Sequence, residues 1–482
     1  MHPGESVLRA DMKNTIPYSR SSGSQGKTFT SFMSDIYGIL LSCCGVLLLA
    51  SGCASYGVVE NAAMTNQASA QEYSIKSFAE SRENNEIFLV LSFSGGGTRA
   101  AALAYGIMLE LHETNVILKK QGSTRLLNEV DTISSVSGGS FTAAYYGLHG
   151  DGMFDTFEQV FLLQNVEKPL ILSLLNPLHW FSNKGRTELA VKYYQEHIFH
   201  GATYADMKKP GRPMIVINAS DLAHGVRFSF VQEYFDLLCS NLLSFPVARA
   251  VTASSAVPVA FNPIVVENFS GCTKDDPEWL RKIHERGEAE HNTELSTLAA
   301  GLETYADKEQ RKFIHFVDGG ITDNIGLRAY YDVVELLGGP EAYLEKTNQE
   351  RPDKWVVIAV DASTSPVFAI DETNKQPSIK ETMSAMSGVQ LHRYNEASIN
   401  LLKNSLFKWT NGLSTPESPV TPYFIEVSFE DIKESSVKQF YNEIPTSFSL
   451  KDEQVDKLIE AGRQLLRDNP DFQRLLADIS NS

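Results

Sequence analysis

Short apolar runs, each ending at small or polar residues, constrain the fold of this chain more than any other feature. Residues 87–91 (IFLVL) are apolar at every position, which is typical of a strand buried on both faces of a sheet. A glycine cluster follows, and residues 99–113 are alanine-rich and predict a helix. Further strands are predicted at residues 130–136, 214–217, 314–317 and 355–360. Because strands alternate with helices, we expect a three-layer α/β/α fold with a mainly parallel central sheet.

The charge balance narrows the classes of partner. Among 482 residues, 42 are Lys or Arg and 59 are Asp or Glu, which gives a formal net charge of −17. Nucleic acid is not an expected partner, because phosphate binding requires clustered basic side chains. Docking on anionic lipid through surface charge is not expected either. A chain with this balance needs another means of reaching a membrane.

Residues 36–50 (IYGILLSCCGVLLLA) form an uncharged run near the N-terminus. The run is shorter than the about 20 apolar residues of a transmembrane helix, and with basic residues upstream it is typical of a secretory signal. It ends in Leu-Ala-Ser-Gly-Cys53, which resembles the lipobox of bacterial lipoproteins. The resemblance implies lipid attachment at Cys53 and anchoring in the bacterial cell envelope, and Ala54 implies the outer membrane. An uncleaved signal anchor is the alternative interpretation.

Two cysteines, Cys239 and Cys272, lie in the body of the chain, whereas the other three lie in or beside the apolar run. Export would place both in an oxidising compartment, where a disulfide between them is possible. Two buried free thiols are the alternative, because the sequence gives no distance between them. The body has no Cys-x-x-Cys pair, which excludes a zinc ribbon or a thioredoxin-type motif.

Composition divides the chain into four predicted parts. Residues 1–52 are the signal segment, and residues 53–85, rich in Ala, Ser, Asn and Gln, predict a flexible tether. Residues 86–430 are expected to form the main domain, and residues 431–482 a helical extension packed on it. The charged, helix-prone stretch 268–312 is interpreted as a solvated surface insertion, with a lid over a substrate cleft as the alternative.

The first chemical motif is the glycine-rich stretch SGGGTR at residues 94–99, directly after the first predicted strand. Acyl transfer creates an oxyanion, and consecutive glycines let backbone N–H groups approach such a charge closely. The following helix would direct its N-terminus to the same place. A phosphate-binding loop would need Gly-Lys-Ser/Thr at its end, and a dinucleotide-binding loop a different glycine spacing. The stretch therefore favours an oxyanion site.

A serine and an aspartate complete the set of candidate catalytic residues. Ser137 lies in SVSGG at the end of a predicted strand, where small neighbours predict a nucleophile elbow between strand and helix. Asp318 lies in DGG at the end of another, placed to reach into a cleft. Binding sites in open α/β sheets gather at the carboxyl ends of strands. The rival acids in a similar context are Asp221, Asp323 and Asp361.

In this order, the three motifs resemble the patatin-like phospholipase family over about residues 86–361. The resemblance implies a patatin-like fold with C-terminal helices and a catalytic dyad of Ser137 and Asp318. The resemblance further implies that the backbone of Gly95, Gly96 and Gly97 supplies the oxyanion donors. It also implies a positioning role for Arg99. Residues 218–221 and 253–258 look like core and cleft-lining segments of the family.

The chain departs from the family pattern at two positions. Ser135 stands where the elbow usually has glycine, and Ala100 where the glycine loop often has a further glycine. Serine is also small, so the first departure is compatible with a tight turn.

The activity that the resemblance implies is lipid acyl hydrolysis, of a phospholipase A or lysophospholipase kind, through an acyl-enzyme on Ser137. A carboxylate can act as the base when partial desolvation raises its pKa, so neither a cofactor nor a metal is expected. The expected partners are a lipid or acyl-ester substrate and a membrane reached through the N-terminal lipid anchor. An acyltransferase using the same acyl-enzyme is an alternative. A non-catalytic exported scaffold lipoprotein with a degenerate esterase fold is another.

Histidines offer rivals to the dyad. A triad would require a late histidine, and His315 and His392 are the candidates, although neither has a convincing loop context. His197 and His200 have the spacing of one helical face, but no acid-rich second element accompanies them as a metal site would need. The dyad is therefore the predicted arrangement.

Overall fold

An eight-stranded sheet organises the described part of the computed structural model, which comprises residues 57–64, 72–80, 86–166, 185–258, 260–272, 278–365 and 374–481. Five strands run parallel in the order β12-β11-β2-β5-β6. They are β2 (Ile87–Phe93), β5 (Val130–Val136), β6 (Met214–Asp221), β11 (Lys354–Asp361) and β12 (Thr421–Ser428). The antiparallel members are β7 (Arg227–Ser229), β9 (Ile264–Glu267) and β10 (Phe313–Asp318). Every strand predicted from the sequence is present.

Strands β5 and β10 follow one another along the same edge of β6. Alternate residues of a strand direct their N–H and C=O groups to opposite edges. Val216 O accepts from a side chain of β5 and Leu222 N donates to β10, whereas Ile217 O accepts from the residue after β7. Strand β5 runs parallel to β6 and β10 antiparallel to it. The carboxyl ends of β5 and β10 therefore point toward each other.

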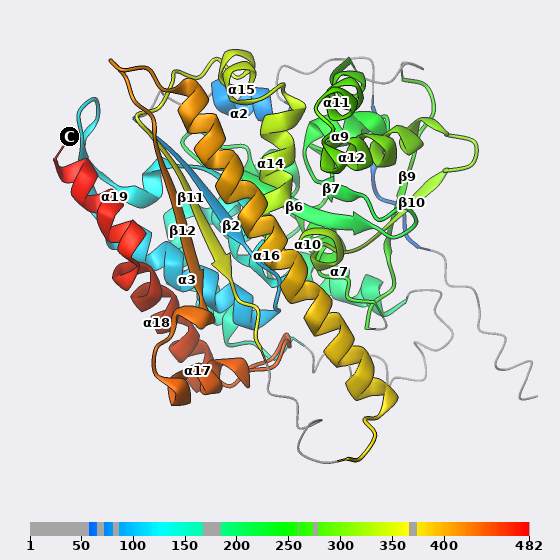
Figure 1. Cartoon of the computed structure of the whole chain (residues 1–482). Helices are drawn as coiled ribbons and strands as arrows, with labels where there is room; N and C mark the ends of the chain where they lie inside the picture. Colours follow the sequence, from blue (N-terminus) through cyan, green and yellow to red (C-terminus); the bar gives the residue numbers. More distant parts are fainter. Residues whose placement is uncertain are drawn as a thin grey trace, which may run out of the picture. The chain divides into compact units, whose positions relative to one another are not determined.

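Helices α3 (Thr98–Glu113) and α4 (Gly138–His149) pack on one face of the sheet. Helix α18 (Asp452–Asp468) packs along α3 (Figure 1). Helices α3 and α18 are in backbone contact. A Cβ on Gly106 would lie 2.1 Å from the carbonyl oxygen of Ile459. A Cβ on Gly462 would lie 2.4 Å from that of Leu103. Helix α18 of the C-terminal region is therefore packed on the main domain.

Helices α14 (Leu327–Leu336) and α16 (Ile379–Leu413) cover the other face, with α16 running along the strands (Figure 1). Trp355 of β11 donates from Nε1 to the Tyr330 hydroxyl of α14 at 2.9 Å. Trp409 of α16 donates from Nε1 to Glu335 Oε1 at 2.8 Å. These contacts satisfy the polar atoms of the large aromatic side chains buried in this layer. The predicted three-layer α/β/α fold is confirmed.

The other elements of the described residues surround this core. The helices are α2 (Ile75–Glu80), α5 (Met153–Phe157), α7 (Arg186–His197), α8 (Tyr204–Met207), α9 (Gln232–Leu237), α10 (Val247–Ser254), α11 (Glu278–Ala289), α12 (Thr293–Glu303), α13 (Gly320–Asp323), α15 (Pro340–Lys346), α17 (Ser435–Asn442) and α19 (Pro470–Ser480). Two strand pairs are β1 (Ala62–Ala63) with β8 (Ser240–Asn241), and β3 (Asn115–Leu118) with β4 (Gly122–Arg125). The charged stretch 268–312 contains α11 and α12, whose apolar faces join the core through Leu280, Leu295 and Leu298.

Two stretches of the expected flexible tether are ordered parts of the domain, which corrects that prediction for residues 57–64 and 72–80. The Tyr73 hydroxyl accepts from Ile215 N at 3.0 Å and donates to Ile215 O at 3.1 Å. Arg249, which is fully buried, donates to Glu60 at 2.8 Å. Because only a few side chains anchor these stretches, their sequence shows no apolar periodicity. No helix within the described ranges is both long and apolar enough to cross a bilayer.

Candidate active site

Ser137 occupies a sharp turn between β5 and α4. Its backbone angles are φ 50° and ψ −120°, and a conformation of this kind costs a non-glycine residue about 1–3 kcal/mol. A Cβ on Gly138 would lie 2.0 Å from Gly97 O, which excludes any side chain there. A Cβ on Gly139 would lie 2.7 Å from Phe93 Cβ, with the same consequence. The turn has the geometry of a nucleophile elbow.

The hydroxyl of Ser254 bridges the end of β5 to β6. Ser137 N donates to Ser254 Oγ at 2.8 Å, and Ser254 Oγ donates to Asn218 O at 2.6 Å. The carbonyl of Ser254 also accepts from Gly319 N at 3.0 Å. Ser254 therefore holds the backbone of Ser137 and the turn after Asp318 in one arrangement. Its segment, 253–258, is indicated by the sequence, but this bridging role is not.

Asp318 ends β10 and faces Ser137. The carboxylate lies close enough to the Ser137 hydroxyl for the hydroxyl to lower its pKa, and Gly320 N donates to Oδ1 at 2.8 Å. Burial raises the pKa of Asp318 to about 6, although the Gly320 hydrogen bond and the Ser137 hydroxyl act to lower it. Only 8% of Asp318 and 5% of Ser137 is exposed. The pair thus combines a sheltered hydroxyl with a carboxylate that takes up a proton close to neutral pH.

The glycine loop after β2 packs directly against the elbow. A Cβ on Gly95 would lie 3.2 Å from Ser137 Cβ. Gly97 has a φ of 62°, and a Cβ there would lie 2.5 Å from Ser447 O. These approaches explain why the loop is built from glycine. Ser447 lies in the C-terminal region, far from the loop in sequence, and no sequence signal indicates it.

The backbone amides of the loop are not equivalent. Gly95 N donates to Asn324 O at 2.9 Å, so this amide is already engaged, and the assignment of Gly95 as an oxyanion donor is corrected. Among the residues that the structure describes, no acceptor is hydrogen-bonded to the backbone N–H groups of Gly96 and Gly97. The loop therefore offers two free N–H groups beside Ser137, and Asn324 is a contact that the sequence analysis missed.

Arg99, in the first turn of α3, is buried and ties the loop to distant segments. Its Nε donates to Ala362 O at 2.9 Å, its Nη1 to Ile444 O at 2.5 Å and its Nη2 to Thr446 Oγ1 at 3.0 Å. Burial lowers the pKa of Arg99 to about 10, and the nearby Asp361 charge opposes that shift. These contacts fit the predicted positioning role and leave the side chain only 3% exposed.

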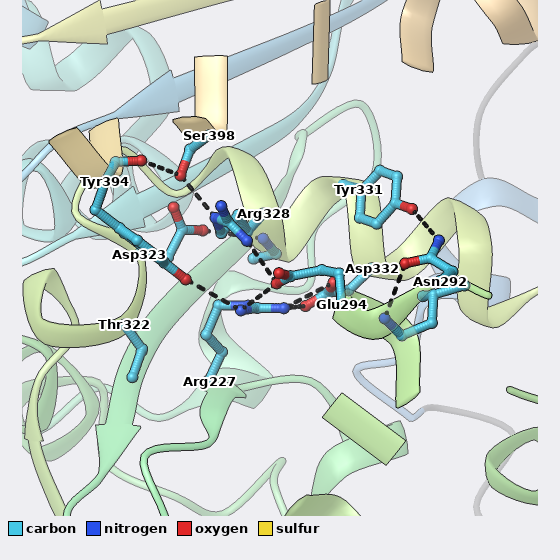
Figure 2. Close-up of polar contacts among 12 residues, drawn as sticks. Arg227, Asn292, Glu294, Thr322, Asp323, Arg328, Tyr331, Asp332, Tyr394 and Ser398 are labelled. Carbon is cyan, nitrogen blue, oxygen red and sulfur yellow. Dashed lines mark hydrogen bonds and ion pairs between the residues drawn. The ribbon is translucent and has the colours of Figure 1, made fainter. Parts of the chain in front are cut away.

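The rival Asp323 belongs to a buried charged cluster behind the DGG turn (Figure 2). Its carboxylate accepts from two backbone N–H groups at the start of α14, at 3.1 and 3.0 Å. In the same cluster, Arg227 pairs with Asp332 at 2.9 Å and with Glu294 of α12 at 2.8 Å. Burial raises the pKa of Asp323, and Arg227 opposes that shift. Asp323 acts as a helix cap that holds the turn bearing Asp318.

The other two rival acids are also engaged away from Ser137. Asp221 forms an ion pair with Arg311 and accepts from Ala223 N at 3.0 Å. Asp361 accepts from Ser363 N at 2.8 Å and from an amide of α16 at 3.2 Å. Neither carboxylate therefore competes with Asp318 for the hydroxyl.

The histidine candidates do not join the pair. His315 is exposed on β10, and His392 contacts Thr364 O at 3.0 Å. His197 packs against a tyrosine ring at a tilt, and His200 contacts Glu196 O at 3.1 Å. Within the described ranges, no three His, Cys, Asp or Glu side chains are grouped as a metal ion would require.

Cys239 and Cys272 form a disulfide, with their Cα atoms 5.6 Å apart. Of the two alternatives that the sequence left open, the structure has the disulfide and not two free thiols. The bond joins the second residue after α9 to the chain beyond β9. Cys53, the predicted lipid-attachment residue, lies outside the described residues.

The described fold and site define an α/β/α protein with a serine elbow, a facing carboxylate and a glycine loop. The family model described as patatin-like phospholipase matches residues 91–330. The match runs from β2 to α14 and includes the loop, Ser137 and Asp318. The chain therefore belongs to the patatin-like phospholipases, a family of lipid-hydrolysing enzymes. No curated protein matches the chain.

Solved structures resemble the chain at low sequence identity. Human GIVD cytosolic phospholipase A2 is 12% identical, with a TM-score of 0.39, over 89% of this chain and 69% of that chain. VipD from Legionella pneumophila is 12% identical, with a TM-score of 0.28, over 86% of this chain and 73% of that chain.

Proposed function

We propose that the protein hydrolyses acyl esters of lipids with Ser137 as the nucleophile and Asp318 as the base. The observation that carries the proposal is that the Ser137 hydroxyl, on a strained turn, interacts with a buried carboxylate whose pKa burial raises to about 6. A serine hydroxyl is a weak nucleophile unless a base lies within hydrogen-bond reach. The lipid substrate class follows from the family.

In the acylation step, Asp318 takes the proton of the Ser137 hydroxyl as Oγ attacks the ester carbonyl carbon. The negative charge that develops on the carbonyl oxygen accepts hydrogen bonds from Gly96 N and Gly97 N, which need no reorganisation to meet it. The carbon–oxygen bond to the alcohol then breaks, and the leaving alcohol takes the proton from Asp318. The product is an acyl ester of Ser137.

In the deacylation step, Asp318 acts as the base a second time. It takes a proton from water, and the hydroxide attacks the acyl carbon while the same two amides stabilise the oxyanion. The bond to Ser137 Oγ breaks, and Oγ recovers its proton from Asp318. The fatty acid leaves, and the pair returns to its starting state.

The substrate that we propose is a phospholipid or lysophospholipid, cleaved as by a phospholipase A or a lysophospholipase. The family supports this choice. Hydrolysis of phosphatidylcholine and lysophosphatidylcholine vesicles, compared with a triacylglycerol emulsion, measures the preference. Transfer of the acyl group to an added alcohol would identify an acyltransferase instead.

We further propose that the protein is a lipoprotein of the bacterial outer membrane, lipidated at Cys53 after cleavage of residues 1–52. The support is the apolar run that ends in Leu-Ala-Ser-Gly-Cys53 and the following Ala54. Mass spectrometry of the mature N-terminus tests the proposal. A diacylated Cys53 peptide that Cys53→Ser abolishes is the expected result, and an intact residue 1 would contradict it.

A fluorophosphonate label tests the central claim. We expect one adduct, on Ser137, and loss of both labelling and hydrolysis in Ser137→Ala with the fold retained by circular dichroism. Ser387→Ala, at an exposed serine of α16, is the matched control and should keep both. An adduct on another serine, or hydrolysis that survives Ser137→Ala, would overturn the assignment.

A further inference from the structure

Asn324, directly after α13, joins three loops at the carboxyl edge of the sheet. Its carbonyl accepts from Gly95 N at 2.9 Å, and its Nδ2 donates to Ser363 Oγ at 3.2 Å. Its own backbone continues from the turn that bears Asp318. The loops after β2, β10 and β11 therefore meet at this one residue, which is only 6% exposed.

The side-chain oxygen of Asn324 lies beside both members of the pair. Oδ1 is 2.7 Å from the position that a Gly95 Cβ would occupy, and Ser137 Cβ is 3.2 Å from the same point. Oδ1 is also 2.9 Å from the position of a Gly320 Cβ, and Asp318 Oδ1 is 3.0 Å from that point. The amide thus fills the space that the two glycines leave open between the loop and the pair.

Ser363, which accepts from the Asn324 amide, is itself held by hydrogen bonds. Asn395 of α16 donates from Nδ2 to Ser363 Oγ at 3.0 Å and to Asp361 Oδ2 at 3.2 Å. Ser363 N donates to Asp361 Oδ1 at 2.8 Å. A hydrogen-bonded chain therefore runs from buried Asn395 to the Asn324 amide and fixes its orientation.

We propose that Asn324 is a positioning residue that sets the separation between the oxyanion loop and the Ser137–Asp318 pair, and that its side chain must be neutral to do so. The inference rests on the proposed function of that pair. The carbonyl of Asn324 orients the loop by engaging Gly95 N, which leaves the amides of Gly96 and Gly97 for the substrate. The amide side chain keeps the loop at its distance from Asp318 without adding charge beside it.

The requirement for neutrality follows from the surroundings of Asp318. Burial, the hydrogen bond from Gly320 N and the nearby Ser137 hydroxyl set the pKa of Asp318, and no charged side chain of the described residues shifts it. A carboxylate at position 324 would be a like charge beside Asp318, and like charges disfavour the ionised form of a neighbouring acid. Asn324→Asp preserves the shape of the side chain and changes its charge.

Two variants separate positioning from simple structural support. Asn324→Asp should move the acidic limb of the kcat/KM profile upward by about one pH unit. Asn324→Ala should lower kcat by roughly 10- to 100-fold with little change in KM, because the loop loses its fixed distance, and should leave the limb in place. Asn128→Asp is the matched control, because it adds the same charge at an exposed site by the opposite end of β5. It should change neither the acidic limb nor kcat.

The outcomes are decisive in both directions. An unmoved acidic limb in Asn324→Asp, or a kcat within twofold of the parent in Asn324→Ala, overturns the proposal. If Asn324→Ala fails to fold, Ser363→Ala removes the acceptor of the amide instead and should lower kcat with KM unchanged. Failure of the proposed function is distinguishable, because it would appear as hydrolysis that persists in Ser137→Ala, whatever the Asn324 variants do.

Discussion

Ser137 and Asp318 meet where two strands approach each other end to end along one edge of β6. Val136, just before the nucleophile, pairs with Asn218, and Asp318 pairs with the next residue of β6, Ala219. Strand β5 reaches this level parallel to β6, whereas β10 reaches it antiparallel. The two side chains therefore emerge at the same level of the sheet, so a proton can pass between them without a third residue.

The pKa of Asp318 predicts the acidic limb of the activity profile. The base must be ionised to accept the Ser137 proton, and burial raises the pKa of Asp318 to about 6. We therefore expect kcat/KM to be level above about pH 7 and to fall about tenfold per pH unit below pH 6. A histidine base would give a limb in a similar range, so the profile is measured together with Asp318→Asn.

Asp318→Asn distinguishes the two kinds of base. The amide cannot accept the proton, so activity should fall by about 100-fold or more and the remaining rate should lose the limb near pH 6. His315→Gln and His392→Gln serve as controls and should retain the limb. Persistence of the limb in Asp318→Asn would assign the titration to another group.

Local sequence properties predicted much of this site. The apolar runs mark the core strands, and the small residues around Ser137 and Asp318 are demanded by the tight turns that follow those strands. Close approach requires glycine at Gly97 and Gly138, so the motif is visible without knowledge of the fold. These requirements act over a few residues, which is why a sequence pattern reveals them.

Contacts between distant segments were not predictable in the same way. The strand direction of β10 depends on its partner β6 and not on its own residues. Gly95 N donates to Asn324 O, which lies far along the chain. This contact leaves two of the three predicted oxyanion donors, Gly96 N and Gly97 N, for the substrate. Tyr73 belongs to a stretch of polar composition and is nevertheless a buried anchor.

Backbone strain at Ser137 predicts an unusual order of stability between two inactive variants. With φ 50° and ψ −120°, this position suits glycine better than alanine. Ser137→Gly and Ser137→Ala both lack the hydroxyl, but Ser137→Gly should be more stable by about 1 kcal/mol. Urea unfolding measures the difference. At Ser387, within helix α16, alanine should instead exceed glycine by about 1 kcal/mol, and equal stabilities at position 137 would contradict the strain.

The disulfide predicts a redox-dependent stability. It spans 33 residues, and closing a loop of that length stabilises the fold by about 3–4 kcal/mol through the unfolded chain. Cys239→Ser combined with Cys272→Ser should lower the free energy of unfolding by that amount. A reductant should do the same to the parent protein and leave the double variant unaffected. A parent protein that does not respond to reduction under unfolding conditions would contradict a stabilising bond.

Tyr73 tests whether the stretch before the sheet is part of the folded domain. Its hydroxyl satisfies both Ile215 N and Ile215 O, at 3.0 and 3.1 Å, on the edge of β6 that β5 does not occupy. Tyr73→Phe keeps the ring and leaves both buried backbone groups without this partner, so we expect a loss of about 1–3 kcal/mol in denaturant unfolding. Lys76→Ala, whose side chain is 70% exposed in the parent, is the control and should change stability little. A flexible tether would make both variants neutral, because an unpacked hydroxyl contributes nothing to the folded state.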